Sequence, residues 1–421
     1  MKRKPAIAFH TLGCKLNQAE SELLAQQFAR AGYCIANGEK ADICILNTCT
    51  VTHIADRKSR QLLRSLRKKN PEATLIATGC YAERAPQELA QIGANLVVDN
   101  KQKMHLLELT NDVLNSMPCH SAGHLSHDST NRVRSFIKIQ DGCNDFCTYC
   151  IVPEVRGQEY CLPVTEIIKE IETRVSAGYR EVILTGTKIG AYRYQGANLR
   201  SLVEQILVNT NVERLHLSSL QPQEISPELL SLWQDSRLCH HFHLALQSGN
   251  DTILKRMGRR YSIADYREAV SSIRKVIPDA AITTDIMVGF PGESASEFQE
   301  SYRFCQEMGF ANIHVFSYSP RPGTLAARMP DSINAKLKKD RSQQMLELAQ
   351  ISARNFCERS LGQTTLVLWE NEVKPGSGIY SGLSHNYIRV FAESQQPLTN
   401  QLLSIRLIRL HHEGLWGEVI R

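Results

Sequence analysis

The sequence of 421 residues lacks any long uninterrupted hydrophobic segment. The apolar run in the basic stretch MKRKPAIAFH is far shorter than the core of a signal peptide, and no run approaches the roughly 18 apolar residues of a membrane span. We therefore expect a cytoplasmic protein with no membrane partner. Hydrophobic residues make up an ordinary 42% of the chain, and its length suits about three globular domains.

Cysteines paired at disulfide spacing are also absent, although the chain contains 13 cysteines. An odd number of unpaired cysteines in a cytosolic protein argues against a disulfide framework and favours thiolates that bind a metal or a cluster. We expect the cysteines that bind nothing to be buried apolar side chains.

A fourth ligand is missing from the stretch DGCNDFCTYC, which contains Cys143, Cys147 and Cys150. Structural zinc sites and complete iron–sulfur sites close their coordination with four protein ligands. A 4Fe–4S cluster held by three cysteines leaves one iron open for a substrate or cofactor. Zinc is the alternative, and the lack of a second cysteine pair at finger spacing disfavours it.

Residues 5–100 alternate short apolar runs with polar segments of helical character. This alternation predicts a parallel sheet covered by helices on both faces, a doubly wound α/β fold. Cys14, Cys49 and Cys80 each fall at or just after the C-terminal end of a predicted strand. Open parallel sheets bind ligands at that edge, so we expect the three cysteines to converge there.

The segment ADRKSRQLLRSLRKKN combines basic residues with leucines at helical spacing. Its charged face is either simply solvated or contacts phosphate groups, and in the second case Arg57, Arg60 and Arg64 are the candidate RNA contacts. The net charge of +6 permits a polyanionic partner without requiring one.

Residues 112–131 are polar and aperiodic, which predicts a linker between an N-terminal domain at 1–111 and a central domain at 132–360. A loose group in this segment comprises Cys119, His120, His124 and His127. We interpret these side chains as solvated rather than as metal ligands.

The strand–helix alternation resumes between Arg134 and about Pro330 with six strand candidates. They are SFIKIQDGC, EVILTG, RLHLSSL, HFHLALQSG, AITTDIMVGF and NIHVFSYSP. Six such units predict a partial (βα)6 barrel rather than a closed eight-stranded one, with its chemistry at the C-terminal ends of the strands. DGCNDFCTYC follows the first of them.

Strand parity in HFHLALQSG places Gln247 nearest the C-terminal edge of its strand, which predicts that it faces a bound cofactor. His243, on the same face, is interpreted as a packed side chain, and the role of Asp285 stays open. Gly186 and Gly289 either allow a cofactor to approach the backbone or mark ordinary strand-end turns.

After a predicted helix at 334–360, residues 361–421 form five short alternating stretches. They predict a small antiparallel β-barrel of a kind that often binds nucleic acid. Five basic residues balance five acidic ones there, so the domain is formally neutral. Tyr387, Arg389 and Phe391 alternate onto one face, where they either contact RNA or pack within the barrel.

The complete set of motifs resembles the radical S-adenosylmethionine methylthiotransferases over essentially the whole chain. The matching segments are TLGCKLNQAESE, LNTCTVT, TGCYAE, DGCNDFCTYCIVPEVRG, LTGTKIGAY, LQSGNDTILKRMGR, TDIMVGFPGES and FSYSPRPGT. The resemblance implies that Cys143, Cys147 and Cys150 hold a 4Fe–4S cluster that binds S-adenosyl-L-methionine. It also implies that Cys14, Cys49 and Cys80 hold an auxiliary 4Fe–4S cluster, and that the C-terminal barrel is a TRAM-like module.

The signature TLGCKLNQ followed by NTCTVT and GCYA is similar to one tRNA subtype of this family. The resemblance implies conversion of N6-threonylcarbamoyladenosine at tRNA position 37 to its 2-methylthio derivative. The implied partners are the tRNA anticodon stem-loop, an electron donor such as flavodoxin or ferredoxin, and a sulfur source. The alternatives are methylthiolation of N6-isopentenyladenosine or of a ribosomal-protein aspartate, a different radical reaction, and a non-catalytic RNA-binding protein.

Overall fold

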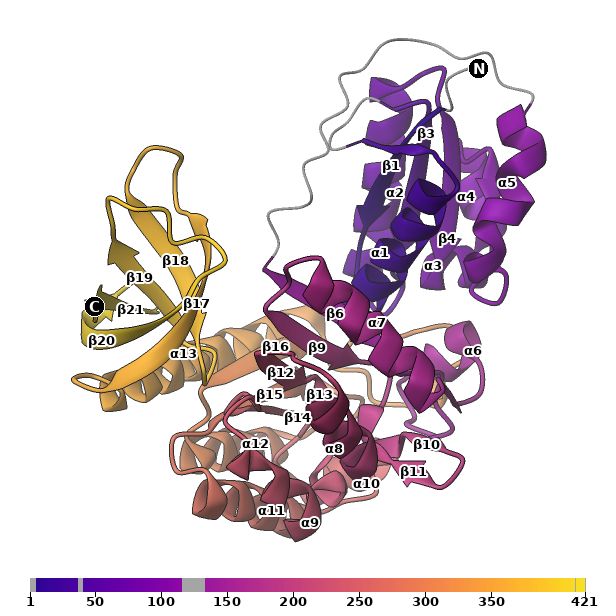
Figure 1. Cartoon of the computed structure of the whole chain (residues 1–421). Coiled ribbons are helices and arrows are strands. Elements are labelled where there is room, and N and C mark those ends of the chain that lie inside the picture. The colour runs from indigo at the N-terminus through magenta and orange to yellow at the C-terminus, as the bar shows by residue number, and fades with distance from the viewer. Residues whose placement is uncertain (1–4, 37–40, 116–132, 413, 421) are drawn as a thin grey trace.

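The computed structural model describes residues 5–36, 41–115, 133–412 and 414–420. They form an N-terminal α/β unit, a central partial barrel and a C-terminal β-barrel (Figure 1). Within these ranges no helix combines the length and the apolar character that crossing a membrane requires.

The N-terminal unit is a parallel five-stranded sheet with the order β2-β1-β3-β4-β5. Its strands are β1 (Ala6–Thr11), β2 (Cys34–Ile35), β3 (Ile43–Thr48), β4 (Thr74–Gly79) and β5 (Leu96–Val97). Its helices are α1 (Lys15–Arg30), α2 (His53–Lys69), α3 (Cys80–Arg84), α4 (Pro86–Ile92), α5 (Leu106–Asn115) and the short η1 (Lys103–His105). The sheet order reverses beside β1 and β3, where open α/β sheets bind ligands.

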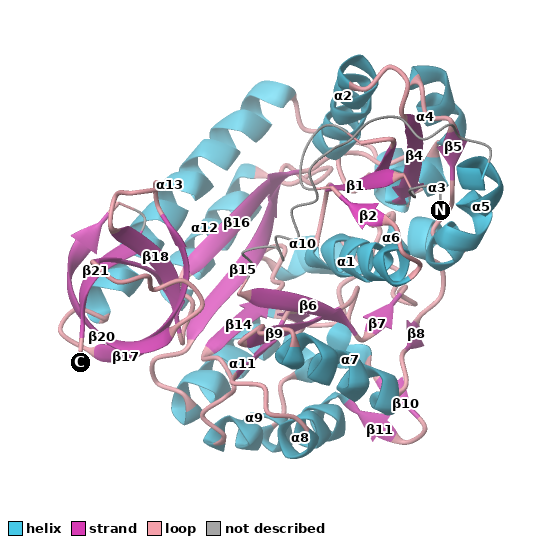
Figure 2. Ribbon diagram, turned by 45° about the horizontal axis from the view of Figure 1, so that its top comes forward, coloured by secondary structure: helices cyan, strands magenta, loops and turns pink. Residues whose placement is uncertain are grey.

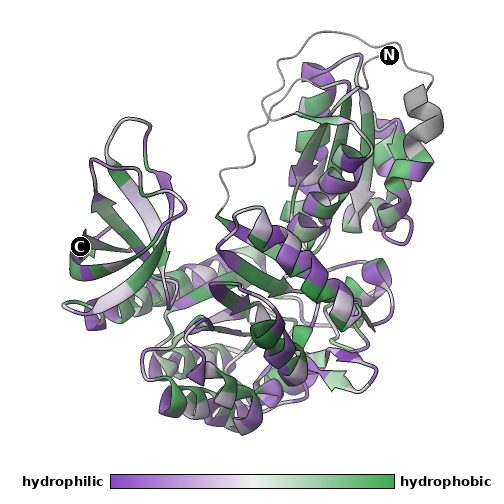
Figure 3. Cartoon of the chain, in the orientation of Figure 1, coloured by the Kyte–Doolittle hydropathy of each residue, from purple (hydrophilic) through white to green (hydrophobic). Residues whose placement is uncertain are grey.

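Both faces of this sheet are covered, which explains why β3 and β4 are fully buried. Leu63 of α2 and Leu89 of α4 pack on one face, and Phe28 of α1 and Leu106 of α5 pack on the other. In Figure 3 the strands are largely hydrophobic, whereas the helices around them carry both colours. The predicted doubly wound fold is confirmed.

The predicted linker begins inside a helix, because α5 extends to Asn115. The rest of the linker, including Cys119, His120, His124 and His127, lies outside the described residues.

The central unit consists of parallel strands in two hydrogen-bonded groups, β12-β9-β6 and β13-β14-β15-β16. An isolated bridge between Leu215 and Leu238 joins the groups. The strands are β6 (Arg134–Lys138), β9 (Glu181–Thr185), β12 (Arg214–Leu217), β13 (Ser219–Leu220), β14 (His241–Leu244), β15 (Ala281–Val288) and β16 (Asn312–Ser317). In the described chain β6 and β16 are not paired with each other, so the predicted partial barrel is confirmed.

Helices surround this barrel and bury a large apolar core between themselves and the strands. They are α6 (Val152–Arg156), α7 (Val164–Ser176), α8 (Leu199–Asn209), α9 (Pro227–Leu230), α10 (Asp251–Arg256), α11 (Ile263–Val276) and α12 (Ala295–Met308). The short elements are η2 (Ile189–Ala191), η3 (Pro222–Glu224), η4 (Ser231–Gln234), η5 (Leu325–Arg328), β7 (Gln140–Asp141), β8 (Tyr160–Cys161), β10 (Arg193–Tyr194) and β11 (Ala197–Asn198). Ser262 and Ser294 begin α11 and α12 through capping boxes, which the sequence signals by Asp or Glu three residues later.

Helix α13 (Ala335–Arg359) leads from the central unit to the C-terminal barrel, and the Asn334 side chain caps its first turn. The barrel strands are β17 (Thr364–Glu372), β18 (Ile379–Ser384), β19 (Arg389–Glu393), β20 (Leu402–His411) and β21 (Gly414–Val419). They close in the order β17-β18-β19-β21-β20 around buried Trp369. The predicted barrel is present, but its β19–β21 pair is parallel. After β19 the chain passes to β20, beside β17, and then returns antiparallel to β20 as β21, next to β19.

The N-terminal unit lies across the open side of the partial barrel (Figure 2). Glu20 and Glu22 of α1 form ion pairs with residues on the β6 side of the barrel. At the other edge, the His53 backbone N–H donates to the Ser319 hydroxyl just beyond β16, at 3.1 Å. The unit that carries one group of cysteines is therefore held against both edge strands of the unit that carries the other.

Candidate active site

The N-terminal cysteines meet at one edge of the sheet, as predicted from their positions after strands. Cys14 precedes α1, Cys49 follows β3 and Cys80 begins α3, directly after β4. Gly13 has a φ of +107°, and a Cβ atom at this glycine would lie 2.8 Å from the Cβ of Cys49. The first loop can approach Cys49 only because residue 13 has no side chain.

Two asparagines support this site. The Asn17 amide nitrogen donates to the carbonyl oxygens of Leu12 at 2.7 Å and Thr48 at 3.0 Å, which ties together the loops that carry Cys14 and Cys49. Its Oδ1 lies 3.9 Å from the Cys14 sulfur. The Asn100 amide nitrogen lies 3.8 Å from the Cys80 sulfur and donates to the Val155 carbonyl at 2.6 Å. Cys80 also packs against Ile151 and Val155 of the central unit.

Cys143, Cys147 and Cys150 occupy the loop between β7 and α6. The loop is anchored at Thr148, whose backbone N–H donates to the Met257 carbonyl at 2.9 Å and whose carbonyl accepts from the Ala326 N–H at 2.7 Å. The Arg259 guanidinium donates to the Cys147 sulfur at 3.3 Å through Nη1. Its Nη2 is buried and has no partner among the described residues, as expected beside a site that receives an anionic group.

The six thiols fit iron–sulfur ligation better than a single metal ion. All six are free, and backbone N–H groups of Val51, Asp145 and Val152 donate to Cys49, Cys143 and Cys150. Hydrogen bonds to sulfur are a feature of iron–sulfur sites. In the described part of the chain no three Cys, His, Asp or Glu side chains converge on one metal ion. A cubane places each thiolate on a different iron, so its three cysteines need not converge on one metal ion.

Burial affects the protonation of four of these thiols before metal binds. It raises the pKa of Cys14 and Cys143, and it raises the pKa of Cys49 and Cys150 to about 12. Because ligation requires the thiolate, cluster assembly at neutral pH must release these protons.

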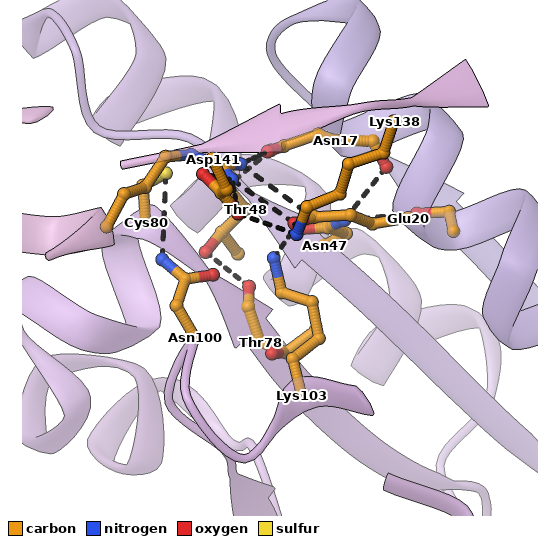
Figure 4. A network of polar contacts seen from close by, with 12 residues as sticks. Asn17, Glu20, Asn47, Thr48, Thr78, Cys80, Asn100, Lys103, Lys138 and Asp141 are labelled. Atoms are coloured by element: carbon orange, nitrogen blue, oxygen red, sulfur yellow. Dashed lines mark hydrogen bonds and ion pairs between the residues drawn. The ribbon is translucent and has the colours of Figure 1, made fainter. Parts of the chain in front are cut away.

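A buried network of charges joins α1 of the N-terminal unit to the central unit (Figure 4). Glu20 of α1 lies 2.7 Å from Lys103, 3.1 Å from Lys138 and 3.2 Å from Arg156. Arg156 also donates to Asp141 at 2.9 Å. Burial alone would raise the pKa of Glu20, but these cations outweigh it and lower the pKa well below its ordinary value. The carboxylate is therefore charged in the domain interface.

A second buried network joins α2 to the segment after β16. Arg321 donates to the Asp56 carboxylate at 2.8 Å and to the Thr50 carbonyl at 2.9 Å. Arg84 approaches the same carboxylate at 3.2 Å. Thr50 immediately follows Cys49, so this network fixes the auxiliary site relative to the barrel.

Gln247 has an unusual backbone conformation at the carboxyl edge of the barrel. Its φ is +70°, which is uncommon for a residue other than glycine. Its N–H donates to the Asp285 carbonyl at 2.8 Å, and its carbonyl accepts from the Met287 N–H at 2.9 Å. Such strain persists where the surroundings impose it and is frequent at ligand sites. The half-buried side chain lies just beyond the end of β14, and its contact with a cofactor stays a prediction.

The two predicted cofactor glycines both allow close approaches within the protein. A Cβ atom at Gly186 would lie 2.7 Å from the Gln140 carbonyl oxygen, and Gln140 in turn supports the start of the cysteine loop. Gly289 has a φ of +71°, and its Cβ position is 2.2 Å from the Lys338 side chain. Their contact with a cofactor stays a prediction.

His243 and Asp285 interact on the inner side of the barrel. His243 Nε2 lies 3.3 Å from the Asp285 carboxylate, and its Nδ1 lies 3.0 Å from the Thr283 hydroxyl. His243 is thus held by hydrogen bonds as well as packed, and Asp285 has a partner within the barrel.

The candidate RNA contacts of α2 differ in their availability. Arg57 and Arg64 are exposed. Arg60 donates to the Tyr81 hydroxyl at 2.7 Å and lies near Glu88. Arg57 and Arg64 are thus more accessible than Arg60, and a phosphate contact stays a prediction.

Tyr387 serves the contact between the C-terminal barrel and the central unit, so the prediction that it faces RNA is not supported. Its ring centroid lies 4.2 Å from that of His216 and 4.7 Å from that of His241, and its hydroxyl donates to Glu181. Burial raises the pKa of Tyr387 well above its ordinary value. The residue has a positive φ of 67°, which turns it out of the expected alternation.

Arg389 and Phe391 instead belong to a different face of the barrel. Phe391 contacts the His411 ring, which also contacts Trp416, and the Arg409 guanidinium lies 4.9 Å from the centroid of Trp416. Arg389 pairs with Glu370 and, together with Phe391 and His412, lines a shallow hollow. This group of aromatic and basic side chains, the barrel face, has the composition that stacks on bases.

Three arginines that organise the site were not singled out from the sequence: Arg156, Arg259 and Arg321. Each lies within a quoted motif, which was the available signal. The residues next to each arginine in the sequence did not distinguish it from a solvated arginine, because its partners come from distant parts of the chain.

Comparison with protein families matches residues 137–305 to the radical SAM superfamily and residues 6–99 to uncharacterized protein family UPF0004. The threonylcarbamoyladenosine tRNA methylthiotransferase MtaB of Bacillus subtilis is 33% identical, over 99% of this chain and 96% of that relative. The MtaB of Aquifex aeolicus is 36% identical, over 93% and 98% respectively. The tRNA-2-methylthio-N(6)-dimethylallyladenosine synthase of Endomicrobium trichonymphae is 31% identical, over 97% and 99%.

Among solved structures, the chain is similar to the radical S-adenosylmethionine methyltransferase TsrM of Kitasatospora setae with cobalamin and a [4Fe-4S] cluster bound. The TM-score is 0.59 at 12% identity, over 90% of this chain and 81% of that one, which shows a shared fold. The full-length relatives decide the family. With its two groups of cysteines at the junction of an α/β domain and a partial barrel, the chain belongs to the radical S-adenosylmethionine methylthiotransferases.

Proposed function

We propose that this enzyme converts N6-threonylcarbamoyladenosine at position 37 of tRNA to its 2-methylthio derivative. The observation that carries the proposal is the placement of two three-cysteine sites on either side of one domain interface. Each site lacks one protein ligand, and Cys80 of the first packs against Ile151, the residue after Cys150 of the second. The likeness to the MtaB proteins, at 33% and 36% identity, supports threonylcarbamoyladenosine as the substrate.

Cofactors supply the difficult chemistry in this family. An unactivated C–H bond offers neither an acidic proton nor a leaving group, so the two 4Fe–4S clusters and S-adenosylmethionine supply electron transfer, methyl donation and a carbon radical when bound. Cys143, Cys147 and Cys150 would hold the radical cluster, and Cys14, Cys49 and Cys80 the auxiliary one. Arg259 would provide a buried positive charge beside the radical cluster, and Gln247 would orient S-adenosylmethionine.

The protein also has to bind RNA around the reacting base. Exposed apolar side chains lie within a few residues of the cysteine sites or of the segments that contact them: Val51, Ile54, Phe146, Phe316 and Leu325. Phe146, between two radical-cluster cysteines, is 82% exposed. We infer that these residues contact nucleobases of the unpaired anticodon loop, while Arg57, Arg64 and the barrel face contact the stem.

Further partners and the compartment follow from this chemistry. Reduction of a cluster requires a one-electron donor such as flavodoxin or ferredoxin, and the inserted sulfur requires a source. A tRNA substrate and the use of free thiols both fit a cytoplasmic enzyme.

The first test compares the modified nucleosides of total tRNA, by liquid chromatography and mass spectrometry, between cells with and without this gene. We expect the methylthio group of threonylcarbamoyladenosine to disappear on deletion and to return with the wild-type gene but not with Cys49→Ala. If isopentenyladenosine changed instead, the enzyme would be of the dimethylallyladenosine type. Unchanged tRNA would direct attention to a ribosomal-protein aspartate.

A further inference from the structure

Each group of cysteines is approached by an arginine of the central unit. Arg259 donates directly to the Cys147 sulfur at 3.3 Å. Arg156, at the end of α6, donates to Asn17 Oδ1 at 2.5 Å, and the same oxygen lies 3.9 Å from the Cys14 sulfur. The Arg259 guanidinium therefore contacts the radical site directly, whereas the Arg156 guanidinium contacts the auxiliary site through the side-chain amide of Asn17.

Arg156 is more than an ion-pair partner of Glu20. Its second nitrogen holds Asn17, whose own nitrogen ties Leu12 to Thr48 beside Cys14 and Cys49. Burial opposes the charge on Arg156, but the Glu20 and Asp141 carboxylates, at 3.2 Å and 2.9 Å, help to outweigh it, and the pKa of Arg156 lies well above its ordinary value. The side chain is thus a permanent positive charge at the auxiliary site, contributed by the other domain.

The buried charges around Arg156 do not cancel. Lys103, Lys138 and Arg156 are positive, whereas Glu20 and Asp141 are negative. A buried site with excess positive charge favours an added electron nearby, because Coulomb interactions are weakly screened in the interior.

We propose that Arg156 is a positioning residue of the auxiliary site, which holds Asn17 beside Cys14 and sets the reduction potential of the auxiliary cluster through its charge. This inference rests on the proposed assignment of Cys14, Cys49 and Cys80 to that cluster. Arg259 is the corresponding residue at the radical cluster, so each potential is adjusted by its own arginine.

The test is potentiometric titration of the reconstituted full-length enzyme, followed by electron paramagnetic resonance. The signal that changes on addition of S-adenosylmethionine identifies the radical cluster. In Arg156→Gln we expect the midpoint potential of the other signal to become more negative, because the reduced cluster loses a stabilising cation. Arg156→Lys retains the charge and should restore most of the potential. Arg259→Gln should shift the signal that responds to S-adenosylmethionine and leave the other unchanged.

Glu20→Gln gives a prediction of opposite sign. It removes a buried negative charge next to Arg156, so the midpoint potential of the auxiliary cluster should become more positive. If Arg156 had only a structural role, both substitutions would shift the midpoint potential in the same direction, or would lower the iron content without changing the potential. A fully loaded Arg156→Gln enzyme with an unchanged potential would overturn the proposal. If the Arg156→Gln enzyme did not bind iron, the Glu20→Gln enzyme would decide. A negative shift of its auxiliary midpoint potential, or no shift, would overturn the proposal.

Failure of the underlying assignment gives a different result. The triple variant Cys14→Ala, Cys49→Ala, Cys80→Ala should lose one cluster's iron and keep the signal that responds to S-adenosylmethionine. If its iron content equalled that of the wild type, the auxiliary-cluster assignment itself would be wrong, whatever Arg156→Gln did.

Discussion

At the scale of single residues, the candidate site brings together groups that are incompletely satisfied or strained. Four of the six cysteines have pKa values raised by burial. Arg259 has a buried nitrogen without a partner among the described residues, and Gln247 has a strained backbone. Unsatisfied or strained groups cost stability, so their concentration at one place indicates a site that is completed by a ligand.

Replacement of Cys49 by alanine should separate the two roles of the enzyme. We expect Cys49→Ala to abolish methylthiolation, because the auxiliary cluster loses one of its three ligands, while 5′-deoxyadenosine formation stays detectable at the intact radical site. Both products are measured in one chromatographic assay. Cys357→Ala, at a half-buried position of α13, is the matched control and should leave both products unchanged. Methylthiolation that survived Cys49→Ala would disprove the role given to this ligand.

Phe146 gives a test of substrate contact. Because its side chain is 82% exposed, Phe146→Ala should change the free energy of unfolding by less than about 0.5 kcal/mol. Loss of one stacked base, worth roughly 1–3 kcal/mol, should raise KM for the anticodon stem-loop by about 5- to 150-fold.

The control for Phe146 is Val208→Ala on the outer side of α8, where the side chain is 78% exposed. It should change neither KM nor stability. Equal KM values for Phe146→Ala and the wild type would exclude a contact between Phe146 and the RNA.

At the scale of elements, two short segments connect the cysteine sites. Helix α6 begins two residues after Cys150 and ends at Arg156, while Val155 packs against Cys80. The segment after β16 supplies Arg321 to Asp56 of α2. Both segments are short and their contacts are buried, so they can fix the distance between two reaction centres.

Arg321→Ala should loosen the N-terminal unit. The substitution breaks a buried pair and leaves Asp56 with the Thr50 hydroxyl and the more distant Arg84, a change that typically costs about 3–5 kcal/mol. Urea denaturation should show a lower midpoint or a separate early transition of this unit. Arg354→Ala removes an exposed pair with Glu358 within α13 and should cost no more than about 0.5 kcal/mol. Equal losses in the two variants would show that the Arg321 network does not hold the domains together.

At the scale of the whole molecule, the C-terminal barrel is fixed to the amino ends of the central strands. Arg214, the first residue of β12, donates to the carbonyls of Leu383 at 2.9 Å and Ser384 at 3.0 Å. Arg180 donates to the Asn400 carbonyl at 2.7 Å. This docking fixes the orientation of the barrel face relative to the cysteine sites.

Two aromatic residues of the barrel should therefore behave differently. Tyr387→Phe removes a hydroxyl that donates to buried Glu181 and should lower the free energy of unfolding by about 1–3 kcal/mol without weakening tRNA binding. Phe391→Ala should weaken tRNA binding, because it removes a ring from the barrel face. Denaturant unfolding and a filter-binding or gel-shift titration measure the two quantities. A loss of tRNA affinity in Tyr387→Phe but not in Phe391→Ala would reverse the assignment of these residues.

By itself the sequence determined the classes of the three units, the strand ends that carry cysteines and the family, because strand periodicity and motif spacing are local properties. Only the tertiary structure decided what Arg156, Arg321 and Tyr387 contact. Their partners Glu20, Asp56 and Glu181 lie from 136 to 265 residues away in the chain. The local sequence around an arginine or tyrosine has the same composition and periodicity whether that side chain is solvated or buried against a charged partner. Packing of whole domains, which no local pattern encodes, makes that difference.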